Sequence, residues 1–180
     1  MDIDLIKSAI RNPYFEICYP KTRLICLENS HANTRKCLSV EYTDQVGELA
    51  KKHGLKLHID GARIFNAAIA LDVPVHRLVQ AADFVSVCLS IGLGAPVGSV
   101  IVGTKIFIDR ARILRKTLGG GMRHVGILCA LALVALQENI PKLVNGHKNA
   151  KTLAEGLNKI KGLKADVAYV AYVATNICVF

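Results

Sequence analysis

A carboxylate ends one predicted strand, and a guanidinium follows it after a short turn. Within LHIDGAR, which ends at Arg63, alternating apolar and polar residues predict a strand that ends in Asp60. A glycine turn follows, and Arg63 enters the next predicted helix. Because ligands of α/β sheets lie beyond the carboxyl ends of strands, Asp60 could contact such a ligand and Arg63 could meet an anion. The alternative is structural, with Asp60 as a helix cap and Arg63 in an ion pair.

A second strand end carries an imidazole. The segment LENSH ends in His31, directly after a short apolar run. Such an imidazole could act as a general base or stack on a ring, since its ordinary pKa lies close to neutrality. The alternative is a histidine that is only hydrogen-bonded to its neighbours.

The third strand end has a hydrocarbon where chemistry would be expected. In FVSVCLSIGLGAPVG a buried strand is predicted to end in Ser90, and Ile91 opens a glycine-rich turn. The glycines lack the G-x-G-x-x-G spacing, and the turn joins two strands, so a dinucleotide site is not indicated. The nearby GSVIVGTK is not a P-loop, because Thr104 separates Gly103 from Lys105.

Alternating strands and helices must position these residues. Strands are predicted over 23–29, 55–60, 83–90 and 98–103, with a strand-like run over 167–180. Helices are predicted over 42–54, 61–71, 75–82, 104–121, 122–140 and 141–160, and the helix over 122–140 should be largely buried. This order predicts an α/β fold with a largely parallel sheet. The segment LGGGMR either connects two helices or binds an anion at the start of the second.

Composition narrows the classes of function. The chain has 180 residues, 52% hydrophobic, and a formal net charge of +9. Scattered basic residues and only 6% aromatics favour solvated helix faces over a nucleic-acid surface. The longest apolar run, 125–136, is too short to span a bilayer. The six cysteines form no C-x-x-C pair, so they are predicted to be reduced core residues of a cytoplasmic protein.

Four segments in one order closely resemble the low-specificity threonine aldolases, which are fold type I enzymes dependent on pyridoxal phosphate. They are ICLENSH, HIDGARIFNAAIA, CLSIGLGAPVGSVIVG and RILRKTLGGGMRHVGILCALALVAL. The resemblance implies that residues 1–140 form part of the cofactor-binding large domain, with helices flanking a mostly parallel sheet. Residues 141–180 would then be a linker helix and the start of the small C-terminal domain.

The resemblance also implies roles for individual positions. Asp60 matches the aspartate that pairs with the pyridinium nitrogen, which keeps the ring able to withdraw electrons. Arg63 matches an arginine beside the phenolic oxygen of the ring, and Ser90 the serine before the Schiff-base lysine. His31 matches a histidine near the β-hydroxyl of the substrate. No metal is implied. The implied reaction is cleavage of L-threonine or allo-threonine to glycine and an aldehyde.

Ile91 departs from the family pattern, because it occupies the position of the Schiff-base lysine. An isoleucine has no amine with which to hold the cofactor or move a proton. The resemblance places the family's phosphate-binding segment upstream of this sequence. We therefore expect doubtful binding of pyridoxal phosphate and a chain that is inactive alone. The alternative is a non-catalytic subunit or regulatory fragment that docks on a full-length homologue, in a homo- or hetero-oligomer with aldolase subunits.

Overall fold

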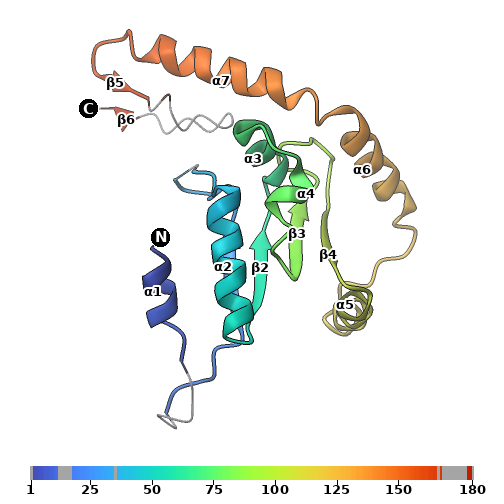
Figure 1. Ribbon diagram of the computed structural model, residues 1–180. Coiled ribbons are helices and arrows are strands. Elements are labelled where there is room, and N and C mark those ends of the chain that lie inside the picture. The colour runs from blue at the N-terminus through green and yellow to red at the C-terminus, as the bar shows by residue number, and fades with distance from the viewer. Residues whose placement is uncertain (1, 12–17, 35, 166, 168–177, 180) are drawn as a thin grey trace.

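A four-stranded sheet forms the centre of the computed structural model, which describes the chain except residues 1, 12–17, 35, 166, 168–177 and 180 (Figure 1). The strands are β1 (Leu24–Glu28), β2 (Lys56–Asp60), β3 (Phe84–Cys88) and β4 (Ser99–Gly103), in the order β1-β2-β3-β4. The first three run parallel, and β4 is antiparallel to β3. The predicted α/β fold with a mostly parallel sheet is therefore confirmed.

Helices form before, between and after these strands. The described helices are α1 (Ile3–Ser8), α2 (Val40–Lys52), α3 (Ile64–Leu71), α4 (Val75–Leu78), α5 (Lys105–Thr117), α6 (Gly126–Glu138) and α7 (Leu143–Leu157). In Figure 1, α7 crosses above the sheet, α6 descends to the right of β4 and apart from it, and α5 lies below β4. A separate antiparallel pair consists of β5 (Leu163–Lys164) and β6 (Cys178–Val179). The rest of the predicted strand-like run over 167–180 lies largely outside the described residues, and the predicted domain boundary at residue 140 stays a prediction.

Local signals account for the ends of α2. The Ser39 hydroxyl accepts a hydrogen bond from the backbone N–H of Tyr42 at 3.2 Å, which satisfies one of the unpaired donors of the first turn. The helix ends at Lys52, and Gly54 follows with φ of 65°. This left-handed conformation suits a glycine and stops the helix at the predicted place.

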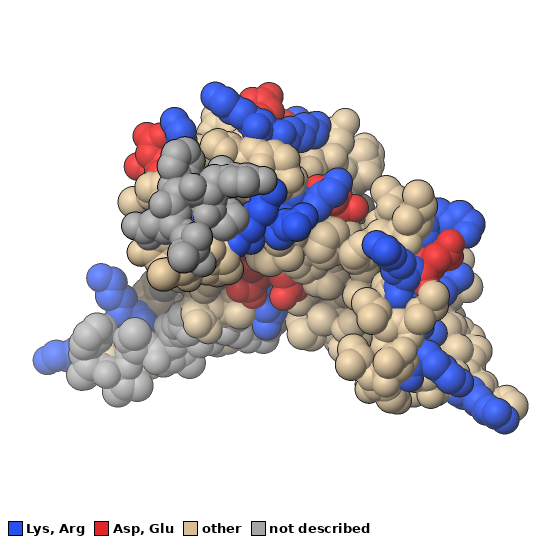
Figure 2. All heavy atoms as spheres, turned by 90° about the horizontal axis from the view of Figure 1, so that it is seen from below, with Lys and Arg blue, Asp and Glu red and all other residues tan. Residues whose placement is uncertain are grey.

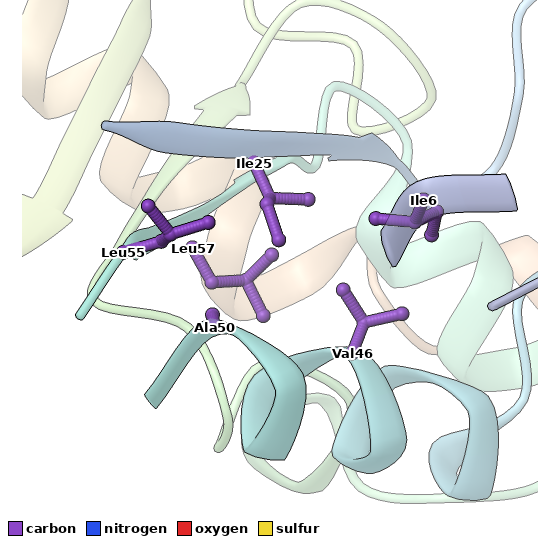
Figure 3. Close-up of a cluster of buried hydrophobic side chains, with 6 residues drawn as sticks. All are labelled: Ile6, Ile25, Val46, Ala50, Leu55 and Leu57. Atoms are coloured by element: carbon purple, nitrogen blue, oxygen red, sulfur yellow. The ribbon is translucent and has the colours of Figure 1, made fainter. Parts of the chain in front are cut away.

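One face of α2 packs against β1 and β2. The buried cluster shown in Figure 3 consists of Ile6, Ile25, Val46, Ala50, Leu55 and Leu57. Val46 and Ala50 point from α2 toward the strands, and Ile6 closes the cluster from α1 (Figure 3). A second cluster joins α3 to α4 through Ile64, Ala67 and Leu78. These contacts fix β2, which ends in Asp60, and α3, which follows it.

The helix α6 is more exposed than its composition predicts. Only Ala132 and Ala135 are buried on it, while the Ile127 side chain is 72% exposed. A helix that is apolar on all sides is normally buried on all sides. All five residues of β4 are also exposed, although the strand reads SVIVG. The predicted burial of the 122–140 helix is therefore wrong for this chain by itself.

The cysteine prediction holds only in part. The five cysteines whose side chains the structure describes are free thiols, but Cys18, Cys26 and Cys129 are exposed. Cys26 is exposed because it alternates along β1 with the buried Ile25. Cys37 and Cys88 are only half-buried, so none of the five described thiols is a core residue, and that part of the prediction is wrong.

Positive and negative charges are interspersed on the described surface, and the described helices are short. On the face shown in Figure 2, lysine and arginine side chains form several separate groups with acidic residues between them. No single helix among the described residues has the length and apolar composition to cross a membrane. The pair α6 and α7 passes that test only together, with a 69° bend at the break.

The pairing of Asp83 with β2 predicts an acid-sensitive contribution to stability. Lys56 Nζ lies 2.7 Å from Asp83 Oδ1, and the N–H of Leu57 donates to Oδ2 at 2.9 Å. Partial burial raises the pKa of the Asp83 carboxyl, but these hydrogen bonds and the lysine charge outweigh it, so the pKa lies below its ordinary value. A lowered pKa means stability that is present above about pH 4 and lost as the pH falls further.

We expect Asp83→Asn to lower the free energy of unfolding near neutral pH by less than about 1 kcal/mol, because Lys56 is exposed and Asp83 is partly exposed. The same substitution should flatten the loss of stability below about pH 4. Urea unfolding at several pH values measures both effects. Parallel curves for the native chain and Asp83→Asn across the acid range would contradict the assignment.

Candidate functional site

Three polar side chains lie in one row at the carboxyl edge of the sheet. The strand register pairs Glu28 with Asp60 and Asp60 with Ser86. The Ser86 hydroxyl lies 3.4 Å from Asp60 Oδ1, in position to donate a hydrogen bond. Sequence analysis identified Asp60 but missed Glu28 and Ser86. A serine inside the apolar run FVSVC was the available signal for Ser86.

The carboxylate of Asp60 is exposed and held from two sides. Besides the Ser86 hydroxyl, the backbone N–H of Ala62 donates to Oδ1 at 3.0 Å. Asp60 is not the helix cap that the structural alternative required, since α3 begins at Ile64 with Arg63 as its N-cap residue. Arg63 is half-buried there. The carboxylate of Asp60 therefore faces solvent in a fixed orientation, where a cationic donor could reach it.

His31 is not a member of this row, but its side chain lies close to Glu28 at one end of the row. Its Nδ1 accepts hydrogen bonds from the N–H groups of Asn33 and Thr34, at 3.3 and 3.2 Å. Its Nε2 lies 3.8 Å from the Glu28 carboxylate. A neutral ring in this arrangement carries its proton on Nε2. His31 also lines a cavity of about 800 Å³ between β1 and α1, and Asp60 is not among the lining residues.

A buried asparagine fixes the loop that carries His31. The Asn29 side chain is only 1% exposed. Its Nδ2 donates to the carbonyl oxygen of Leu38 and its Oδ1 accepts from the N–H of Leu38, both at 3.2 Å. The N–H of Asn29 donates to the carbonyl oxygen of Asp60 at 2.9 Å. One residue therefore closes the loop and joins it to β2.

The glycine turn starts earlier than predicted. The strand β3 ends at Cys88, not at Ser90. The reason is that Leu89 already makes the turn, with its N–H donating to the carbonyl of Gly98 and its own carbonyl accepting from the N–H of Ala95, both at 3.0 Å. Ser90 and Ile91 follow as exposed residues beyond the carboxyl end of β3. The Ile91 side chain is 39% exposed.

The residues singled out from the sequence thus lie at one edge of the sheet, and among them His31 alone lines the cavity beside α1. Asp60 lies at the centre of the polar row, and Ser90 and Ile91 lie beyond the neighbouring strand. His31 reaches this row through Glu28. Within the described ranges, no cluster of three or more histidine, cysteine or acidic side chains could hold a metal ion.

Comparison with known proteins agrees with the family resemblance seen in the sequence. The sequence model of the beta-eliminating lyase family matches residues 1–178. Low-specificity L-threonine aldolase 1 from Arabidopsis thaliana is 68% identical over 171 residues, which is 94% of this chain and 48% of that protein. The chain thus spans about half the length of the curated relatives it matches. The predicted resemblance to the threonine aldolases is confirmed.

Solved structures confirm the predicted fold. A putative aromatic amino acid beta-eliminating lyase/threonine aldolase from Exiguobacterium superposes with a TM-score of 0.82 at 20% identity, over 96% of this chain and 46% of that one. A PLP-dependent aminotransferase from Streptococcus suis gives a TM-score of 0.70 at 16% identity, over 95% and 44% of the two chains. At these identities the likeness concerns the fold, which is that of fold type I.

The hydrogen bonds of Asn29 predict a large effect of its loss. We expect Asn29→Ala to lower the free energy of unfolding by about 1–3 kcal/mol, since it leaves the N–H and carbonyl of Leu38 without their partners. Urea denaturation measures the change. Asn149→Ala is the matched control, because Asn149 lies exposed on α7, and its effect should stay within about 0.5 kcal/mol. Equal effects of the two substitutions would contradict the assigned role.

Proposed function

Since this chain belongs to the beta-eliminating lyase family, we propose that it is a threonine aldolase-like protein that does not cleave threonine by itself. The observation that carries the proposal is the isoleucine at position 91. The site otherwise keeps the carboxylate that the resemblance implies, with Asp60 held by the Ser86 hydroxyl and the N–H of Ala62. The 68% identity to a low-specificity L-threonine aldolase supports the substrate class, an L-threonine type amino acid.

The described side chains fit the ring of pyridoxal phosphate in part. That group supplies an electron-withdrawing ring when bound. Asp60 would hold its protonated nitrogen, because an exposed carboxylate at a strand end is a good acceptor for such a donor. Arg63, next to the same turn, would lie beside the phenolic oxygen. Ser90 would contribute a hydroxyl at the neighbouring strand end.

Covalent attachment does not fit. The side chain at position 91 is a branched hydrocarbon that is 39% exposed, and it can neither form a bond to the cofactor nor carry a proton. Lys105 cannot be assumed to replace it, because it begins α5 after the end of β4, and catalysis requires the amine to be held close to its productive position. The chain therefore lacks both an anchor and a proton carrier at the expected place.

His31 would contribute a proton-transfer group only after rearrangement. Its Nδ1 is occupied by two backbone donors, and its Nε2 faces Glu28. A base for the β-hydroxyl of a substrate needs one ring nitrogen directed at that hydroxyl. In the observed arrangement, Nε2 of His31 instead lies 3.8 Å from the Glu28 carboxylate, whose Oε1 accepts a hydrogen bond from the N–H of Ala32 at 2.8 Å.

A second candidate function rests on the exposed apolar elements. Ile127 on α6 is 72% exposed and Ile101 on β4 is 53% exposed. Large exposed apolar surfaces are typical of protein interfaces. The alternative function is therefore a non-catalytic subunit that docks on a full-length homologue and modulates it.

Without an amine at position 91, the chain should not cleave threonine. We expect the purified chain, supplied with pyridoxal phosphate and L-threonine, to release no more acetaldehyde than its Asp60→Ala variant, because Ile91 provides no amine. A coupled assay with alcohol dehydrogenase measures the aldehyde. Release by the native chain that Asp60→Ala abolishes would refute the inactive assignment.

The exposed apolar residues of α6 should contribute to docking on a full-length homologue. We expect co-expression with the full-length Arabidopsis relative to yield a complex for the native chain and less than about a tenth as much for Ile127→Asp, since a charge in an apolar interface costs several kcal/mol. Leu5→Asp is the matched control, because Leu5 is a similarly exposed apolar residue on α1. A chain that purifies alone in all three cases counts against the subunit function.

A further inference from the structure

The glycine turn that carries residue 91 rests on a buried asparagine from α3. Asn66 is only 4% exposed. A Cβ atom built on Gly92 would lie 2.5 Å from Asn66 Oδ1, and Gly92 has φ of 81°. The amide of Asn66 therefore packs directly against the backbone of Gly92, in space that any other residue would fill. Residue 91 is bonded to that glycine.

The other end of the Asn66 amide reaches α7. Its Nδ2 lies 3.2 Å from Nε2 of His147. With the amide oxygen toward Gly92, Nδ2 is the donor and the imidazole nitrogen is the acceptor. Burial lowers the pKa of His147, which favours the neutral ring that this hydrogen bond needs. A side chain 81 residues away in the sequence thus fixes the rotamer of Asn66.

A second asparagine holds the same turn at the next residue, Leu93. Asn139 Nδ2 donates to the carbonyl oxygen of Leu93 at 2.7 Å. Leu93 is 1% exposed and packs in the cluster with Ala132 and Ala135 of α6. The turn is thereby anchored to α6 at residue 93, whereas at residue 92 its support is Asn66.

We propose that Asn66 and His147 form a partly buried polar clamp that positions residue 91 relative to Asp60. Asn66 lies on α3, whose N-cap residue Arg63 follows Asp60 closely in the chain, so the clamp joins the β2 end of the edge to the turn after β3. Both residues act as positioning residues, through Gly92. The consequence for residue 91 as an anchor position rests on the proposed function, whereas the clamp itself does not.

Hydrogen exchange in the native background tests the clamp directly. We expect Asn66→Ala and His147→Leu to raise amide exchange in the peptide 89–95 about tenfold, the equivalent of one lost hydrogen bond. His147→Gln keeps an acceptor at this position and should exchange like the native chain. His53→Leu is the matched control, since His53 is exposed at the end of α2. Exchange in β2 is the internal reference.

Three outcomes of that experiment would overturn the proposal. The first is unchanged exchange in 89–95 for both Asn66→Ala and His147→Leu. The second is His147→Gln behaving like His147→Leu, which would assign the effect to packing. The third is a rise in β2 as large as in 89–95, which would mean general loosening.

The positioning of residue 91 needs a second readout. In an Ile91→Lys background, Asn66→Ala should slow the formation of a borohydride-stable adduct of pyridoxal phosphate at the introduced lysine about tenfold. An equal rate with and without Asn66→Ala would overturn the positioning role. Absence of any adduct with Ile91→Lys alone would contradict the proposed cofactor site instead, while exchange in 89–95 would still decide whether the clamp exists.

Discussion

The register between β2 and its two parallel neighbours determines which side chains meet at the carboxyl edge. Leu57 and Ile59 are buried on one face of β2, which leaves Asp60 on the other face beside Glu28 and Ser86. A slip of one residue would bury the carboxylate and expose the core. Packing of α2 and α3 against the sheet thus fixes the position of the polar row, although the three polar side chains themselves lie outside the core. The hydrogen bonds of Asn29 and Ala62 then secure the loops on either side of it.

Position 91 is constrained differently from Asp60. Its backbone is held between Gly92, which contacts Asn66, and Leu89, which bonds across the turn. Its side chain is 39% exposed, so packing does not require a hydrocarbon there. A lysine at this position would keep its ammonium group in water and would not cost the folding energy of a buried charge. An isoleucine here supplies no amine, while the turn that presents its side chain is held by these contacts.

Sequence patterns predicted the strands and Asp60, because period-two alternation and a following glycine turn are local properties. They missed Glu28, since its place in the polar row follows from the register between two strands. They also missed the contact of Asn66 with His147, which only the tertiary fold brings together. Apolar composition predicted a buried α6, but burial depends on what covers a helix, and the described chain covers only Ala132 and Ala135. The same reason explains the exposed Cys129.

We propose that this edge is a cofactor site with an isoleucine in place of the amine. The most direct test is the intact mass of the native chain, Ile91→Lys and Ile91→Met after incubation with pyridoxal phosphate and reduction with borohydride. The account predicts one saturable adduct on Ile91→Lys, lost on adding Asp60→Ala, and none that is site-specific on the other two chains. A site-specific adduct on the native chain, or none on Ile91→Lys, would contradict it.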